Sequence, residues 1–130
     1  MKPVPQITQL TRPYWDGAAA GELRVQRCAK CSGRSLYARP WCPFCWAPEL
    51  TWEKVSGRGD VIACTIVTQA PYESYARDGR YAIAIIKLEE GPQMMANIVN
   101  CPLEKVKVGM KVGVVFEKRG DITVPQFAPL

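Results

Sequence analysis

The 130-residue sequence contains no histidine. This absence excludes nucleophiles activated by histidine, histidine acid–base catalysis and every metal site that uses a histidine ligand. The sequence also has no run of about 20 apolar residues, the length that a membrane-spanning helix requires. Its first residues lack the apolar stretch of a secretory signal, so we expect a cytoplasmic protein that does not bind a membrane. The composition therefore disfavours a self-sufficient enzyme of the familiar histidine-dependent kinds.

A concentrated run of basic charge is also missing. The chain has 17 basic and 12 acidic residues, a formal net charge of +5, but the basic residues are scattered along it. A positive balance is typical of nucleic-acid binding, yet scattered charge is equally compatible with a solvated surface, an anionic small molecule or an acidic partner. Charge alone leaves these alternatives open.

Cysteine, in contrast, is present and clustered. Four of the six cysteines form two Cys-x-x-Cys pairs ten residues apart: Cys28, Cys31, Cys42 and Cys45. Each pair places two sulfurs on one tight turn, and two facing turns make the tetrahedral sulfur cage that Zn²⁺ prefers. Iron in the same cage and two disulfides are the alternatives. Four thiolates leave no open coordination position, so we expect one structural zinc ion and no metal-based catalysis.

The remaining pattern predicts a mainly β protein. Residues 8–21 contain a short amphipathic helix, and short strands surround the cysteines. Five further strands are expected at 60–70, 81–88, 93–99, 110–116 and 122–127, with no long helix between them. Such a series is typical of a small barrel, here a five-stranded OB-type barrel. We therefore predict a helical segment at 1–21, a zinc ribbon at 22–54 and an OB-fold barrel at 55–130.

The order of these motifs resembles a known family. The order is Tyr14-Trp15, Cys28-x-x-Cys31, Arg39-Pro40-x-Cys42-Pro43-x-Cys45, Val55-Ser56-Gly57-Arg58-Gly59 and Pro125-Gln126-Phe127. It resembles the domain-of-unknown-function 35 family, acyl-CoA-associated OB-fold proteins with an N-terminal rubredoxin-like zinc ribbon. Trp46 departs from the family pattern, because many members carry glycine after the last cysteine, and this difference bears on the local turn.

The resemblance implies a function. Family members are similar to accessory subunits of thiolase-type and related acyl-CoA enzymes, so the implied role is a non-catalytic or co-catalytic subunit that helps to bind a CoA thioester. The implied partner is a thiolase-fold enzyme in a hetero-oligomer; an acyl-CoA hydratase or aldolase is the alternative. A second alternative is a module that binds single-stranded nucleic acid, but Lys87 is the only basic residue within strands 60–70 and 81–88. A stand-alone thioesterase or lyase has no supporting constellation.

Candidate binding residues follow from the chemistry of CoA. Arginine suits its phosphates and aromatic rings suit its adenine, and the same residue types dominate protein interfaces. We interpret Trp41 and Trp52 as packing between ribbon and barrel. No catalytic residue is predicted. The candidates for CoA binding or a partner interface are Arg34, Arg39 and Trp46 in the ribbon and Tyr72, Tyr75, Arg77, Arg80 and Tyr81 in the loop at 71–81.

Overall fold

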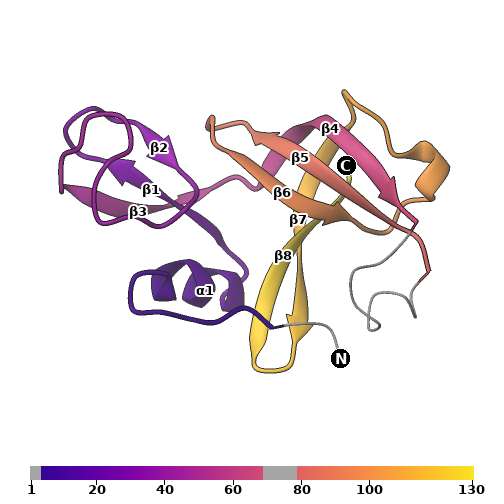
Figure 1. Cartoon of the computed structure of the whole chain (residues 1–130), viewed down its shortest axis with the longest axis horizontal. Helices are drawn as coiled ribbons and strands as arrows, with labels where there is room; N and C mark the ends of the chain where they lie inside the picture. Colours follow the sequence, from indigo (N-terminus) through magenta and orange to yellow (C-terminus); the bar gives the residue numbers. More distant parts are fainter. Residues whose placement is uncertain (1–3, 69–78) are drawn as a thin grey trace.

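A computed structural model describes residues 4–68 and 79–130 of the chain (Figure 1). One helix is followed by a three-stranded sheet and then by a closed five-stranded barrel, as the sequence predicts. No helix among the described residues is long and apolar enough to cross a membrane. The elements are α1 (Arg12–Ala19), β1 (Leu23–Cys28), β2 (Arg34–Ser35), β3 (Leu50–Val55), β4 (Arg58–Val67), β5 (Tyr81–Leu88), β6 (Gln93–Ile98), the 3₁₀ turn η1 (Leu103–Lys105), β7 (Lys111–Arg119) and β8 (Ile122–Pro129).

Helix α1 connects the N-terminal segment to the ribbon. Pro13 lies in its first turn, where a missing N–H group leaves no helical hydrogen bond unmade. The hydroxyl of Thr11, the N-cap residue, accepts a hydrogen bond from the Thr8 amide rather than from a helix amide. Gly17 and Ala18 form the buried face, and a Cβ at Gly17 would lie only 2.6 Å from the Arg24 side chain. This contact lets α1 pack closely on β1, and α1 also packs on β8 of the barrel.

The ribbon sheet has β1 in the middle. It pairs with β2 and β3, both antiparallel, and the register places Gln26 opposite Trp52 on one side and Ser35 on the other. Beyond the ends of these strands lie the two turns that carry the four cysteines. The sheet therefore forms a stem, and the cysteine turns form its tip, which points away from the barrel (Figure 1).

The barrel closes in the order β4-β5-β6-β8-β7. β4 pairs with both β5 and β7, and a bulge between Val61 and Ala63 shifts its register against β5. A single parallel contact between Ile98 and Phe127 joins β6 to β8 and completes the ring. Bulges bend and twist a strand, which is what closure of a small barrel requires.

Two separate hydrophobic clusters hold the described chain together. The large cluster fills the barrel around Phe127, Ile86 and Val112, and it also includes Leu23, Val25 and Val55 from the ribbon stem. The small cluster lies in the tip, where only Cys28, Cys42 and Ala47 are buried. The stem is therefore continuous with the barrel core, whereas the tip has almost no apolar interior of its own.

Candidate metal centre and the surface around it

The four predicted metal ligands converge at the ribbon tip. Their sulfur atoms all lie within 4.8 Å of one another. The Sγ atoms of Cys28 and Cys45 are 3.6 Å apart, as are those of Cys31 and Cys42. Ligands of a tetrahedral zinc ion lie about 3.8 Å apart, because Zn–S bonds are about 2.3 Å long. A disulfide requires about 2.05 Å, so the sulfurs fit a zinc cage and not two disulfides.

Backbone amides surround these sulfurs. The amides of Lys30 and Cys31 donate to Cys28 Sγ at 3.3 and 3.4 Å, and the amide of Gly33 donates to Cys31 Sγ at 3.4 Å. The Cys31 amide contributes most to lowering the pKa of the Cys28 thiol, against the opposing effect of burial. Amides aimed at sulfur favour the thiolate, which is the form that binds metal.

The two cysteine turns have the same backbone geometry. The Ser32 amide donates to the Cys28 carbonyl, and the Trp46 amide donates to the Cys42 carbonyl, both at 2.9 Å. Ser32 and Trp46 both have left-handed backbones, with φ of 63° and 66°. The turn at Trp46 is thus formed without glycine, at the strain that a left-handed backbone imposes on a bulky residue.

Aromatic side chains cover the outside of the tip. Tyr37, Trp41, Phe44 and Trp46 are between 55% and 77% exposed. The interpretation of Trp41 as a residue packed between ribbon and barrel is therefore wrong. The tip lies beyond the reach of the barrel core, and its own core has no room for an indole. A surface with several large exposed aromatic residues is typical of a site that a ligand or partner covers.

Arg39 lies between two hollows. On one side it forms a cleft of about 200 Å³ with Trp41 and Trp46. On the other it borders an open groove of about 630 Å³ together with Trp52 and the N-terminal Leu10. Arginine and aromatic rings at one place are the groups that would recognise a phosphate and an adenine ring.

Gln26 holds the backbone of Arg39 in place, a role that the sequence pattern does not indicate. Its side chain is buried, accepts from the Arg39 amide at 2.9 Å and donates to the Arg39 carbonyl at 3.1 Å. In the strand pattern Gln26 looks like an ordinary outward polar residue between Val25 and Arg27. Only the return of the chain at Arg39 reveals its role, so no local signal could have found it.

The other predicted residues lie elsewhere. Arg34 donates two hydrogen bonds to the Glu53 carboxylate, at 2.9 and 3.3 Å, and these bonds lower the pKa of Glu53. Arg34 is thus engaged within the ribbon sheet. Arg80 and Tyr81 lie at the start of β5, at the end of the barrel away from the ribbon (Figure 1). Tyr72, Tyr75 and Arg77 fall outside the described residues. Among the candidates that the structure describes, Arg39 and Trp46 meet in one cleft of the ribbon, and Arg80 and Tyr81 lie together at the far end of the barrel.

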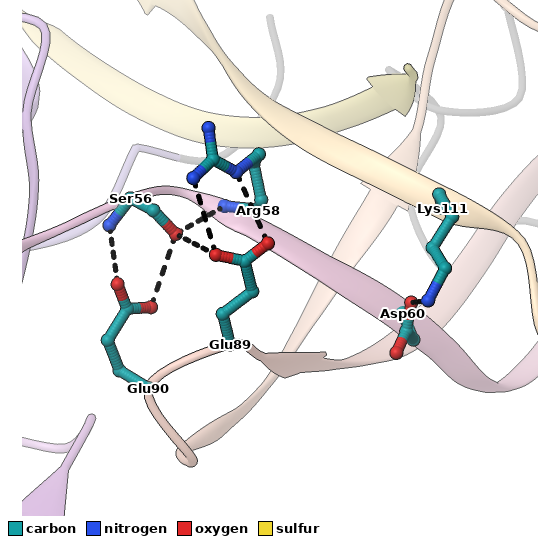
Figure 2. A network of polar contacts seen from close by, with 6 residues as sticks. All are labelled: Ser56, Arg58, Asp60, Glu89, Glu90 and Lys111. Atoms are coloured by element: carbon teal, nitrogen blue, oxygen red, sulfur yellow. Dashed lines mark hydrogen bonds and ion pairs between the residues drawn. The ribbon is translucent and has the colours of Figure 1, made fainter.

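A polar network joins the ribbon to the barrel at the hinge between β3 and β4 (Figure 2). The Ser56 amide donates to Glu90 at 2.8 Å, and the Ser56 hydroxyl contacts both Glu89 and Glu90 at 3.3 Å. Arg58 donates twice to Glu89, at 3.2 and 3.4 Å. Beside them, Lys111 pairs with Asp60 across β7 and β4. The β5–β6 turn therefore holds the residues that link the ribbon to the barrel.

Comparison with known proteins assigns the fold to a family. The rubredoxin-like zinc ribbon domain of ChsH2 matches residues 15–51, and the C-terminal OB-fold domain of ChsH2 matches residues 52–117. The chain belongs to the ChsH2 (DUF35) family. The predicted resemblance is confirmed over most of the chain. A DUF35 domain-containing scaffold protein of Methanocaldococcus jannaschii is 38% identical over 93 residues, covering 71% of this chain and 65% of that protein.

Two further relatives of this chain are named as hydratase alpha subunits. A probable enoyl-CoA hydratase alpha subunit of Thermomonospora curvata is 26% identical over 130 residues, covering 99% of this chain and 40% of the relative. The 3-oxo-4,17-pregnadiene-20-carboxyl-CoA hydratase alpha subunit of Mycobacterium tuberculosis is 33% identical over 111 residues. This match covers 83% of this chain and 34% of the relative. This chain therefore spans well under half the length of these two subunits.

Solved structures of DUF35 proteins share the whole architecture. The chain of a structure described as an Ltp2-ChsH2(DUF35) aldolase superposes with a TM-score of 0.86 at 25% identity, covering 97% of this chain and 98% of that one. A DUF35 protein of unknown function from Sulfolobus solfataricus superposes with a TM-score of 0.67 at 15% identity, covering 94% of this chain and 86% of that one. This likeness supports the fold alone.

Proposed function

We propose that this chain is a non-catalytic subunit of an enzyme that acts on CoA thioesters. It helps to hold the CoA part of the substrate and docks on the catalytic subunit through the ribbon tip. The observation that carries the proposal is the cleft that exposed Trp41 and Trp46 form with Arg39, at a tip whose four metal ligands fill a structural site. Relatives named as subunits of CoA-thioester hydratases, and a structural match named as an aldolase, support the substrate class.

The residues of this chain favour a non-catalytic role. It has no histidine, and four cysteine ligands fill a tetrahedral zinc site. A zinc ion bound there would stabilise the tip and supply no open position for substrate or water. The acidic residues that the structure places together, Glu89 and Glu90, are occupied by Ser56 and Arg58. We therefore expect the catalytic groups to come from a partner.

The groove beside Arg39 is the proposed site for CoA. Its volume of about 630 Å³ falls within the range of about 300–1,000 Å³ that is usual for ligand sites. Arg39, which borders both hollows, supplies the cation for a phosphate. Trp52 in the groove, or Trp41 and Trp46 in the adjoining cleft, supplies a face for adenine. Gln26 holds the backbone of Arg39 and so acts as a positioning residue.

The identity of the partner is a finer proposal. The name of the structural match favours an aldolase and the names of two sequence relatives favour hydratases. A thiolase-fold catalytic subunit, which the resemblance implies, is compatible with the aromatic tip as a docking surface. Interfaces of stable complexes bury roughly 1,200–2,000 Å², and exposed tryptophan and arginine dominate their energies.

This function can be tested by recovering the tagged chain from its own cells and assaying the recovered material for turnover of CoA thioesters. We expect the unmodified chain to retain a catalytic subunit in stoichiometric amount, with activity on CoA thioesters. The variant Trp46→Ala should lose the partner, while Val108→Ala, an exposed apolar residue after η1, should retain it. A chain that stays alone and binds single-stranded DNA with a steep salt dependence would overturn the proposal in favour of the nucleic-acid alternative.

A further inference from the structure

A second, smaller cavity lies where three parts of the molecule meet. Its volume is about 250 Å³, and it is partly enclosed. Helix α1 contributes Tyr14 and Trp15, the ribbon segment at 36–38 contributes Leu36 and Tyr37, and β6 contributes Met94. We call this cavity the junction pocket. Its walls come from the N-terminal segment, the ribbon and the barrel, so it exists only in the assembled fold.

The lining of the junction pocket is apolar and uncharged. None of its described lining residues is acidic or basic. Its few polar atoms include the phenol groups of Tyr14 and Tyr37. Burial, together with the neighbouring Tyr37 phenol, raises the pKa of Tyr14 to about 12. Tyr14 is therefore neutral at physiological pH and keeps a proton to donate. Such a pocket rejects phosphate and accepts an apolar group that carries an oxygen acceptor.

The junction pocket is a neighbour of the Arg39 groove. The same two segments line both hollows with different residues. The segment at 8–15 contributes Thr11, Tyr14 and Trp15 to the pocket and Thr8, Gln9, Leu10 and Pro13 to the groove. In the segment at 36–40, residues 36–38 line the pocket and residues 39–40 line the groove. A ligand with a charged end and an apolar end could therefore occupy the two at once. A CoA thioester has this division, with phosphates at one end and the acyl group at the other.

The size of the junction pocket limits what it can hold. A volume of 250 Å³ equals about eight waters at about 30 Å³ each. This is room for a short acyl chain or one ring of roughly eight non-hydrogen atoms, and far too little for CoA itself. Met94 and the exposed Met95 can adjust to different shapes, because methionine is unbranched and flexible.

We propose that the junction pocket binds the uncharged acyl group of the CoA thioester, and so contributes to substrate selection from outside the catalytic subunit. This inference rests on the proposed function. It assigns Tyr14 as a donor to an oxygen of the acyl group and the Met94 region as the wall for its carbon chain.

Calorimetric titration of the zinc-loaded chain with CoA thioesters of increasing acyl length tests this. Affinity should rise about fourfold for each added methylene, the equivalent of about 0.8 kcal/mol for a buried CH₂, and level off at six to eight carbons. Acyl thioesters of N-acetylcysteamine, which lack the phosphates and adenine, should show the same dependence on length at lower affinity.

Variants that fill the pocket give a second measurement. Ala38→Leu places a larger side chain in the pocket, and Met95→Trp blocks its rim from an exposed position. Both should bind CoA itself as before and lose the dependence on acyl length. Ala19→Leu, which adds the same atoms at an exposed position of α1, is the matched control and should keep it. Zinc content and circular dichroism identify any variant that has not folded.

The outcomes separate this inference from the proposed function. If affinity for CoA thioesters does not depend on acyl length, the proposal that the junction pocket binds the acyl group is wrong, and the accessory role is unaffected. No binding of any thioester also overturns it, while recovery of an active partner still decides the accessory role. Length dependence that survives in both filling variants would show that the acyl group binds elsewhere on the chain.

Discussion

The ribbon tip and the barrel achieve their stability by different means. The barrel buries a continuous set of aliphatic side chains around Phe127, and the ribbon stem adds Leu23 and Val25 to the same cluster. The tip buries two of its cysteines and Ala47 and leaves four aromatic rings in solvent. Burial of apolar surface stabilises the first region, and metal coordination must stabilise the second.

This difference allows large aromatic side chains of the tip to remain on the surface. In a region that is stabilised by hydrophobic burial, tryptophan side chains contribute most when they lie in the core, because they bury a large apolar area. In a region held by a metal, they can remain outside without loss of the fold. Trp41 and Trp46 are therefore available to a ligand or partner, and the comparison predicts that perturbations of the two regions have separable effects.

The largest effect should follow loss of the metal. The variant Cys28→Ser should reduce zinc from one ion per chain to almost none and unfold the tip, because structural zinc contributes about 10–16 kcal/mol in small domains. Hydrogen exchange should become fast at 28–50 and remain slow in β5 and β8. Elemental analysis and exchange mass spectrometry measure both.

Cys101→Ser is the control for this change. Cys101 lies outside the metal cluster, between β6 and η1. Its replacement should leave one zinc ion per chain. If Cys28→Ser retained full zinc or slow exchange throughout the tip, the metal would not be what holds this region.

The next effect concerns the barrel core. Phe127 is fully buried and pairs with Val114 of β7 and Ile98 of β6. Phe127→Ala should lower the free energy of unfolding by about 3–5 kcal/mol in urea titrations while zinc content stays at one per chain. Phe44→Ala, the same substitution at an exposed ring, should change it by less than about 1 kcal/mol. Equal losses from the two variants would remove the distinction between the regions.

A smaller effect should appear at alkaline pH. Tyr14 has an ordinary pKa of 10.0, raised to about 12 in the folded chain. The unfolded chain ionises first, so the contribution of Tyr14 to stability is complete below pH 10 and is lost as the pH rises towards 12. The chain should lose about 1 kcal/mol by pH 11 and about 2 kcal/mol by pH 12 beyond what Tyr14→Phe loses. Parallel pH profiles in urea unfolding would contradict the burial of this phenol.

The smallest effect is expected at the hinge. Glu90→Gln weakens the contacts to Ser56, which lie at an exposed position. Exposed charge contacts contribute about 0–1 kcal/mol, so global stability should hardly change. Hydrogen exchange of the Ser56 amide should nevertheless accelerate, whereas the exposed Glu104→Gln on η1 should leave it unchanged. Unaltered Ser56 exchange would show that Glu90 does not hold the hinge.

The parts of the fold that depend on local patterns could be predicted. The spacing of Cys28, Cys31, Cys42 and Cys45 specifies two identical turns, and alternation in segments such as 81–88 specifies half-buried strands. The structure places β5 at Tyr81–Leu88, the residues expected, and extends the segment at 110–116 to β7 at Lys111–Arg119. Strand ends vary because pairing with a neighbour, and not the residues themselves, determines where a strand stops.

The rest depends on residues that meet only after folding. Gln26 reaches Arg39 thirteen positions away, and Ser56 reaches Glu90 thirty-four positions away. The interpretation of Trp41 as packing between ribbon and barrel fails because the described tip buries only Cys28, Cys42 and Ala47 and has no interior for an indole. The junction pocket combines residues near 14, 37 and 94, which share no pattern in the sequence.

The left-handed backbone of Trp46 has a consequence for engineering and for natural variation. A residue other than glycine loses about 1–2 kcal/mol in that conformation, and this one also exposes 77% of its side chain. A search for stabilising substitutions would select glycine at this position first. Under the proposed function, stability and recognition therefore compete at this one position. A homologue with glycine here would then have a more relaxed tip and one fewer aromatic contact to a partner.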